Sequence, residues 1–119
     1  MFTTIDTENF EYEIITAKDP VLLACIRRDH ELKEQLELLE NVSKENSELK
    51  ICLLHEDFSE IYKILRIEGT PTYLVFLWKE EKGRLLGKVN ITALTAFIAK
   101  SLNMPNDRRS GQISMSFNI

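Results

Sequence analysis

The sequence predicts an α/β fold in which a central mixed sheet carries helices on both faces. Short apolar stretches alternate along the chain with stretches whose apolar residues recur at helical spacing. Two of the apolar stretches, 21–26 and 51–54, contain no polar residue, which is typical of strands that are buried on both faces in a parallel sheet. A short polar turn near residue 80 separates the last two strand candidates and indicates an antiparallel hairpin.

The first strand is predicted over residues 2–5, and either Asp6 or Thr7 can cap the helix that follows it. The apolar residues of this helix stand at helical spacing: Phe10, Ile14 and Ile15. Pro20 ends the helical stretch, and the continuous apolar run 21–26 comes directly after it. We therefore expect 21–26 to be a central strand.

A long amphipathic helix is predicted from about residue 30 to about residue 43, with Asp29 at its cap position. Its apolar side chains recur every three or four residues: Leu32, Leu36, Leu39 and Val42. The second buried strand, 51–54, follows this helix. Asp57 or Ser59 then opens a shorter helix with four apolar residues: Phe58, Ile61, Ile64 and Leu65.

The segment Gly69-Thr70-Pro71 interrupts the helical pattern, and residues 72–78 are rich in strand-forming side chains. Residues 79–83 are expected to form a polar turn, and 84–87 the returning strand. Asn90 can cap a last helix with five apolar residues: Ile91, Leu94, Phe97, Ile98 and Leu102. Because strands and helices alternate, the core sheet is expected to be parallel, with the hairpin adding an antiparallel strand.

Length and composition restrict the classes of protein that fit. The 119 residues suffice for one domain, expected over 1–102, followed by an extension over 103–119. The formal net charge is −4 and no basic stripe is present, which disfavours nucleic-acid binding. No apolar run approaches the roughly 18 residues of a membrane span. With only two cysteines and no signal-peptide pattern at the start, we expect a protein of the reducing cytoplasm.

Residues 2–102 resemble thioredoxin. The resemblance rests on three stretches: Asn9-Phe10-Glu11 with Ile14 and Pro20-Val21-Leu22-Leu23; Ile67-Glu68-Gly69-Thr70-Pro71-Thr72 with Leu74-Val75-Phe76; and Gly87 with Leu94 and Phe97. They look like the family's first helix and central strand, its cis-proline segment, and its last helix with the glycine before it. The resemblance implies the thioredoxin fold.

The chain departs from thioredoxin at the residues that perform its chemistry. The family's Trp-Cys-Gly-Pro-Cys pentad falls on Asp29-His30-Glu31-Leu32-Lys33, and its buried acid falls on Ala24. The chain contains no Cys-x-x-Cys motif. Thiol–disulfide exchange needs an attacking thiolate and a second, resolving thiol. We therefore expect no dithiol oxidoreductase activity and no enzyme of this kind.

The resemblance also suggests a binding site at the cis-proline segment. In thioredoxins the main chain before this proline pairs with an extended substrate, which assigns the pairing role to Thr70. His30 replaces the family's nucleophile at a helix start, where Arg27 and Arg28 precede it and an anion can be held. Alternatively, the proline serves only the fold and the helix start is merely solvated. The predicted binding residues are Arg28, Asp29, His30, Gly69, Thr70, Pro71, Gly87 and Lys88.

Three functional hypotheses remain open. The first is a redox-inactive, chaperone-like or adaptor-like protein that binds a protein or an extended peptide between His30 and Thr70-Pro71, similar in type to the thioredoxin-like accessory proteins of hydrogenase maturation. The second is a redox protein that works through one cysteine, Cys25 or Cys52. The third is a structural homodimer assembled through the extension.

The extension contains an alternating pattern typical of a strand with one apolar face. Its apolar positions are Ile113, Met115, Phe117 and Ile119. This strand can add to a sheet edge of the same or another subunit, or the segment is a disordered terminus. Tyr73 and Trp78 are expected to be strand residues that either pack in the core or form a stripe on the hairpin. The histidines and cysteines show no metal-ligand spacing, so we expect neither a metal nor a cofactor.

Overall fold

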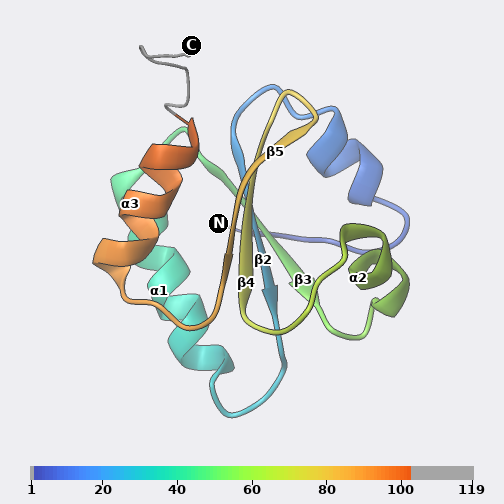
Figure 1. Ribbon diagram of the computed structural model, residues 1–119, viewed down its shortest axis with the longest axis horizontal. Helices are drawn as coiled ribbons and strands as arrows, with labels where there is room; N and C mark the ends of the chain where they lie inside the picture. Colours follow the sequence, from blue (N-terminus) through green and yellow to red (C-terminus); the bar gives the residue numbers. More distant parts are fainter. Residues whose placement is uncertain (1, 103–119) are drawn as a thin grey trace.

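A computed structural model describes residues 2–102 and contains one five-stranded mixed sheet (Figure 1). Its strands stand in the order β1-β3-β2-β4-β5. The prediction of an α/β domain with a mixed sheet is confirmed. The strands are β1 (Phe2–Thr4), β2 (Val21–Ile26), β3 (Lys50–His55), β4 (Thr72–Leu77) and β5 (Glu80–Leu86). The helices are η1 (Glu11–Ile15, a π-helix), α1 (Leu32–Glu45), α2 (Ser59–Leu65) and α3 (Ile91–Leu102).

The directions of the strands correct one expectation. Strands β1, β2 and β3 are mutually parallel, but β4 runs antiparallel to β2, with Cys25 opposite Thr72. The alternating pattern alone predicts a parallel β4. Helix α2 has only seven residues and is about 10 Å long, whereas a six-residue strand spans about 20 Å. The helix therefore does not return the chain to the far end of the sheet, and β4 begins at the edge where β3 ends.

The hairpin between β4 and β5 corrects a second expectation. Its turn consists of Trp78 and Lys79, which have φ values of 51° and 74°, and β5 begins at Glu80, inside the predicted 79–83 turn. Two residues with positive φ form the turn type that suits a tight hairpin. The sequence does not predict this two-residue turn, because neither residue is Gly, Asn or Asp, the usual types at such positions. The charged residues at 80–82 belong to an edge strand, where charge is tolerated.

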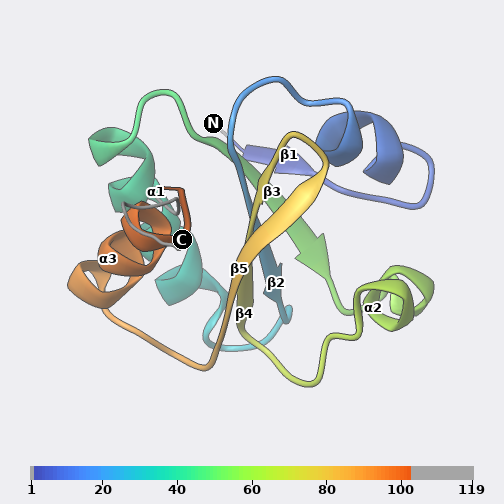
Figure 2. The same ribbon diagram turned by 45° about the horizontal axis from the view of Figure 1, so that its top comes forward.

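Two helical layers enclose the sheet (Figures 1 and 2). Helices α1 and α3 cover one face, where Leu39, Leu94 and Ile98 pack on alternate residues of the central strands. Helices η1 and α2 cover the other face, where Ile14 and Ile61 pack on the intervening residues. Every residue of β2 is buried, as its apolar run predicts.

The packing of the two predicted strand aromatics differs. Tyr73 is fully buried and its hydroxyl donates a hydrogen bond to Oε1 of Gln35 on α1. Burial raises the pKa of Tyr73 to about 12. Trp78 is instead 72% exposed in the hairpin turn, so the expectation that it packs in the core is wrong.

The predictions for the extension lie outside the described residues. These include the strand with Ile113, Met115, Phe117 and Ile119 at its apolar positions. Among the helices of the described chain, none has the length and apolarity needed to cross a membrane.

Candidate functional site

The topology brings the end of β2 against the cis-proline segment. Because Cys25 pairs with Thr72, the residues that follow β2 and those that precede β4 meet at one edge of the sheet. A small cavity of about 40 Å³ lies between them. It is lined by Ile26, Arg27, Asp29, Glu31, Gln35, Thr70 and Pro71. The structure therefore unites Asp29 with Thr70 and Pro71, as the predicted site requires.

A larger groove of about 460 Å³ adjoins this cavity beside α2. It is lined by Arg27, Glu56, Tyr62, Ile67, Glu68, Gly69 and Thr70. Only Arg27 and Thr70 line both hollows. Together the two hollows form what we call the Thr70 groove.

The main chain around Pro71 is held from one side. The Thr70–Pro71 peptide bond is cis. The carbonyl of Pro71 accepts a hydrogen bond from the N–H of Gly87 at 2.8 Å, and the Thr72 hydroxyl donates to the carbonyl of Gly69. The N–H and carbonyl of Thr70 form no hydrogen bond within residues 2–102. Thr70 thus presents an unpaired peptide edge beside the groove.

The start of α1 carries several carboxylates. The Asp29 carboxylate accepts a hydrogen bond from the N–H of Glu31 at 2.9 Å, in the turn before the helix. Glu31 stands at the cap position and forms no capping side-chain hydrogen bond, so the predicted cap at Asp29 is wrong. Lys88 lies 3.2 Å from Glu31 and 3.5 Å from Glu34, and the hydrogen bond with Glu31 raises the pKa of Lys88. Carboxylates are the groups that a helix start attracts, so the positive helix end already has negative partners. This arrangement disfavours the binding of a further anion there.

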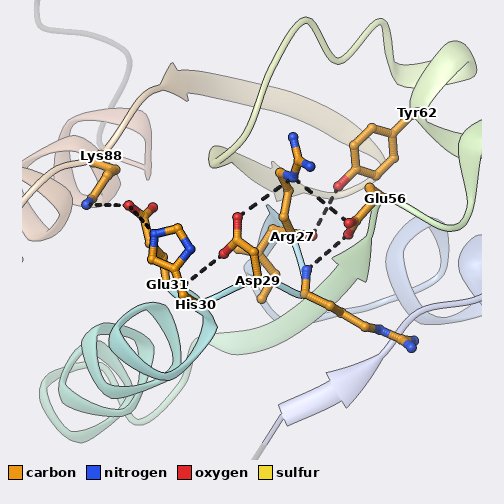
Figure 3. Close-up of polar contacts among 9 residues, drawn as sticks. Arg27, Asp29, His30, Glu31, Glu56, Tyr62 and Lys88 are labelled. Carbon is orange, nitrogen blue, oxygen red and sulfur yellow. Dashed lines mark hydrogen bonds and ion pairs between the residues drawn. The ribbon is translucent and has the colours of Figure 1, made fainter.

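The histidine at the family's nucleophile position points into solvent. The His30 side chain is 87% exposed, and its Nε2 lies 3.8 Å from a carboxylate oxygen of Glu31. His30 does not line the cavity or the groove beside Thr70. It stands at the rim, next to the Glu31–Lys88 pair (Figure 3).

The two arginines before His30 have different surroundings. The Arg27 guanidinium lies between two carboxylates, 3.8 Å from Asp29 and 4.0 Å from Glu56 (Figure 3). Arg28 lines neither hollow: its N–H donates to Glu56 at 3.2 Å and its Nη1 lies 3.4 Å from Asp57. Arg27, rather than the predicted Arg28, is therefore the cation of the Thr70 groove.

Sequence reasoning also missed two acidic residues of the groove, Glu56 and Glu68. A signal for Glu56 was present. Strands β2 and β3 are parallel neighbours, with Ile26 opposite His55, so the next residues of the two strands, Arg27 and Glu56, come out at the same edge. Glu68 stands two residues before Thr70, where the sequence does not show which way the chain turns.

Both cysteines lie on the η1 and α2 face of the sheet, away from solvent. Cys25 and Cys52 are free thiols with no exposed surface. Burial raises the pKa of Cys25 to about 12 and that of Cys52 to about 11. Neither thiol has the exposure or the thiolate character that nucleophilic chemistry requires.

Comparison with known proteins adds no identification. No protein-family model matches the chain, and no curated protein matches it. Within residues 2–102, no three His, Cys, Asp or Glu side chains are placed to hold a metal ion together. The residues around Thr70 therefore carry the functional interpretation.

Proposed function

We propose that this chain is a redox-inactive, thioredoxin-like binding protein that holds an extended segment of another polypeptide at the Thr70 groove. The observation that carries the proposal is the unpaired main chain of Thr70, placed between a cavity and a groove that it shares with Arg27. The strand order and the mixed strand directions, with two helices on each face, support the thioredoxin-like part of the proposal.

The binding mode follows from main-chain chemistry. An extended peptide can add to an unpaired sheet-like edge, because its own N–H and C=O groups pair with those of the edge. Thr70 supplies one donor and one acceptor for such pairing. Successive side chains of an extended peptide point to opposite sides, so neighbouring residues can enter the cavity beside α1 and the groove beside α2.

The positions of the two cysteines argue against catalysis through sulfur. The groove residues include no cysteine, and Cys25 and Cys52 are buried with raised pKa values. The burial of both thiols speaks against the one-cysteine redox hypothesis. We therefore propose a chaperone-like or adaptor-like role, in a reducing compartment such as the cytoplasm, where buried thiols stay unpaired.

A selection with random peptides tests the proposal. The full-length protein is immobilised and a library of short, unstructured peptides is passed over it. Thr70→Trp places a large side chain between the two hollows, so we expect retention to fall at least about tenfold. Thr92→Trp, an exposed position on α3, is the matched control and should retain the same peptides as the wild type.

Thermal unfolding of all three proteins confirms that the variants are folded. If Thr70→Trp is folded and retains the same peptides as the wild type, binding at the Thr70 groove is wrong. If only Thr70→Trp loses them, the proposal is supported.

A further inference from the structure

The walls of the Thr70 groove are acidic. The residues that line its two hollows include a single cation, Arg27, and four carboxylates: Asp29, Glu31, Glu56 and Glu68. Their formal charge is therefore −3. The nearest other cations do not reverse this sign, because each has a carboxylate partner outside the groove. Lys88 is also shared with Glu34, and Arg28 lies beside Asp57. Arg84, whose charge interacts with Glu68, is paired with Glu81 at 2.8 Å.

These carboxylates retain unused capacity to accept hydrogen bonds. Arg27 approaches Asp29 and Glu56 only at 3.8 Å and 4.0 Å, which is longer than a charge-assisted hydrogen bond of about 2.8 Å. Glu68 is exposed and forms no ion pair within the described part of the chain. Glu31 already pairs with Lys88 at 3.2 Å. At the other three carboxylates, a cation that enters the groove does not have to displace a close cationic partner.

The carboxylates stand on both sides of the peptide edge. Asp29 and Glu31 line the cavity beside α1, and Glu56 and Glu68 line the groove beside α2, with Thr70 common to both. Successive side chains of an extended chain point to opposite sides, so these two walls receive the side chains of two successive residues of the segment. A ligand with negative side chains there would meet like charges on both walls.

We infer that the segment held at Thr70 is a basic one, with Lys or Arg at two successive positions beside Thr70, so that one side chain faces each wall. This inference rests on the proposed function and adds the chemical class of its ligand. The main chain supplies the affinity common to all extended segments, and the four carboxylates supply the selection among them. Since the groove is open to water, the selection weakens as salt rises.

Three synthetic peptides test the inference with the full-length protein. They share one neutral, extended framework of Ser, Thr and Val, and they differ only at two successive positions, which are Lys, Gln or Glu. At low ionic strength we expect the Lys peptide to bind about tenfold more tightly than the Glu peptide, with the Gln peptide between them. The preference should shrink at high salt.

Two single-charge variants locate the preference. Glu68→Gln removes a carboxylate without breaking an ion pair, and we expect it to reduce the Lys-over-Glu ratio about threefold. Glu11→Gln makes the same change in net charge on η1, outside the groove, and should leave the ratio unchanged.

The outcomes separate the inference from the function it rests on. If all three peptides bind equally, or the Glu peptide binds best, and Thr70→Trp still abolishes binding, the inference is overturned and the binding function stands. A preference that Glu11→Gln reduces as much as Glu68→Gln also overturns it. If no peptide binds, or Thr70→Trp changes nothing, both fail.

Discussion

Strand β2 and the segment directly after it differ in the exposure and in the charge of their side chains. Cys25 is fully buried, whereas Arg27, two residues later, is exposed between two carboxylates. The interior thus contains both cysteine thiols without access, and the residues that line the accessible edge include no thiol. This separation disfavours thiol chemistry at the edge and agrees with the binding role that we propose.

The separation has a local cause. Side chains alternate along a strand, so Cys25 points to the η1 and α2 face, where Leu54 and Ile61 belong to the same core. The chain leaves the sheet after Ile26, and α1 begins at Leu32. A thiol accessible at this edge would have to stand between them, where the exposed His30 lies.

The largest effect that we expect concerns the reactivity of the two buried thiols, and it tests whether the interior is closed to reagents. At pH 8 a thiol with a pKa of about 12 is almost entirely protonated, so we expect Cys25 to be alkylated roughly a thousandfold more slowly in the folded than in the unfolded protein. Cys52, with a pKa of about 11, should be slowed at least about a hundredfold. Mass spectrometry after iodoacetamide treatment, with and without denaturant, measures both rates. Alkylation of either thiol at its unfolded rate would restore the one-cysteine redox hypothesis.

A second prediction concerns the polar contact between β4 and α1. Tyr73→Phe removes the hydroxyl that donates to Gln35 and leaves a buried acceptor without that partner. We expect the free energy of unfolding to fall by about 1–3 kcal/mol, measured by urea denaturation. Because Tyr73→Phe with Gln35→Leu removes both partners, the double variant should lose less than the two single losses combined. Additive losses would show that the hydroxyl and the amide act independently.

A smaller effect is expected at His55, the last residue of β3. Its Nδ1 is buried and has no hydrogen-bond partner among residues 2–102, and burial, helped by nearby Arg28, lowers the pKa of His55 from its ordinary 6.5. The unfolded chain therefore takes up the proton first as the pH falls. His55 should reduce stability as the pH drops from about 6.5 toward its lowered folded value, and have no effect above about pH 7.5.

Unfolding of His55→Leu against pH measures this contribution. The variant should lose less stability than the wild type between pH 7 and pH 5. His30→Gln removes the other histidine, which is exposed, and its slope is compared with that of His55→Leu. Equal slopes for wild type and His55→Leu would assign the acid sensitivity to other groups.

Much of the fold follows from local patterns. The uninterrupted run 21–26 predicts a strand buried on both faces, and the helical spacing of apolar residues predicts α1, because both signals depend only on neighbouring residues. The direction of β4 and the Trp78-Lys79 turn were not predictable in this way. The first depends on how far a seven-residue helix carries the chain, and the second on residues that adopt an uncommon φ.

The prediction of the site from the sequence has the same limit, because local patterns do not show which distant segments meet. Thr70 and Pro71 were found because a contiguous segment resembles a known motif. Arg27, Glu56 and Glu68 come from three separate segments and meet only through strand pairing and the loop after α2. Their proximity depends on the tertiary structure and cannot be predicted from any single stretch of the sequence.

The most direct test of binding at the Thr70 edge is the behaviour of the Thr70 amide proton. The tightest-binding of the three peptides is titrated into ¹⁵N-labelled protein, and amide shifts and exchange rates are followed by NMR. We expect the Thr70 amide to shift downfield and become protected from exchange as it pairs with the peptide, with smaller changes at Gly69 and Arg27. Saturable binding that leaves these amides unchanged and moves those around Trp78 or β1 would contradict it.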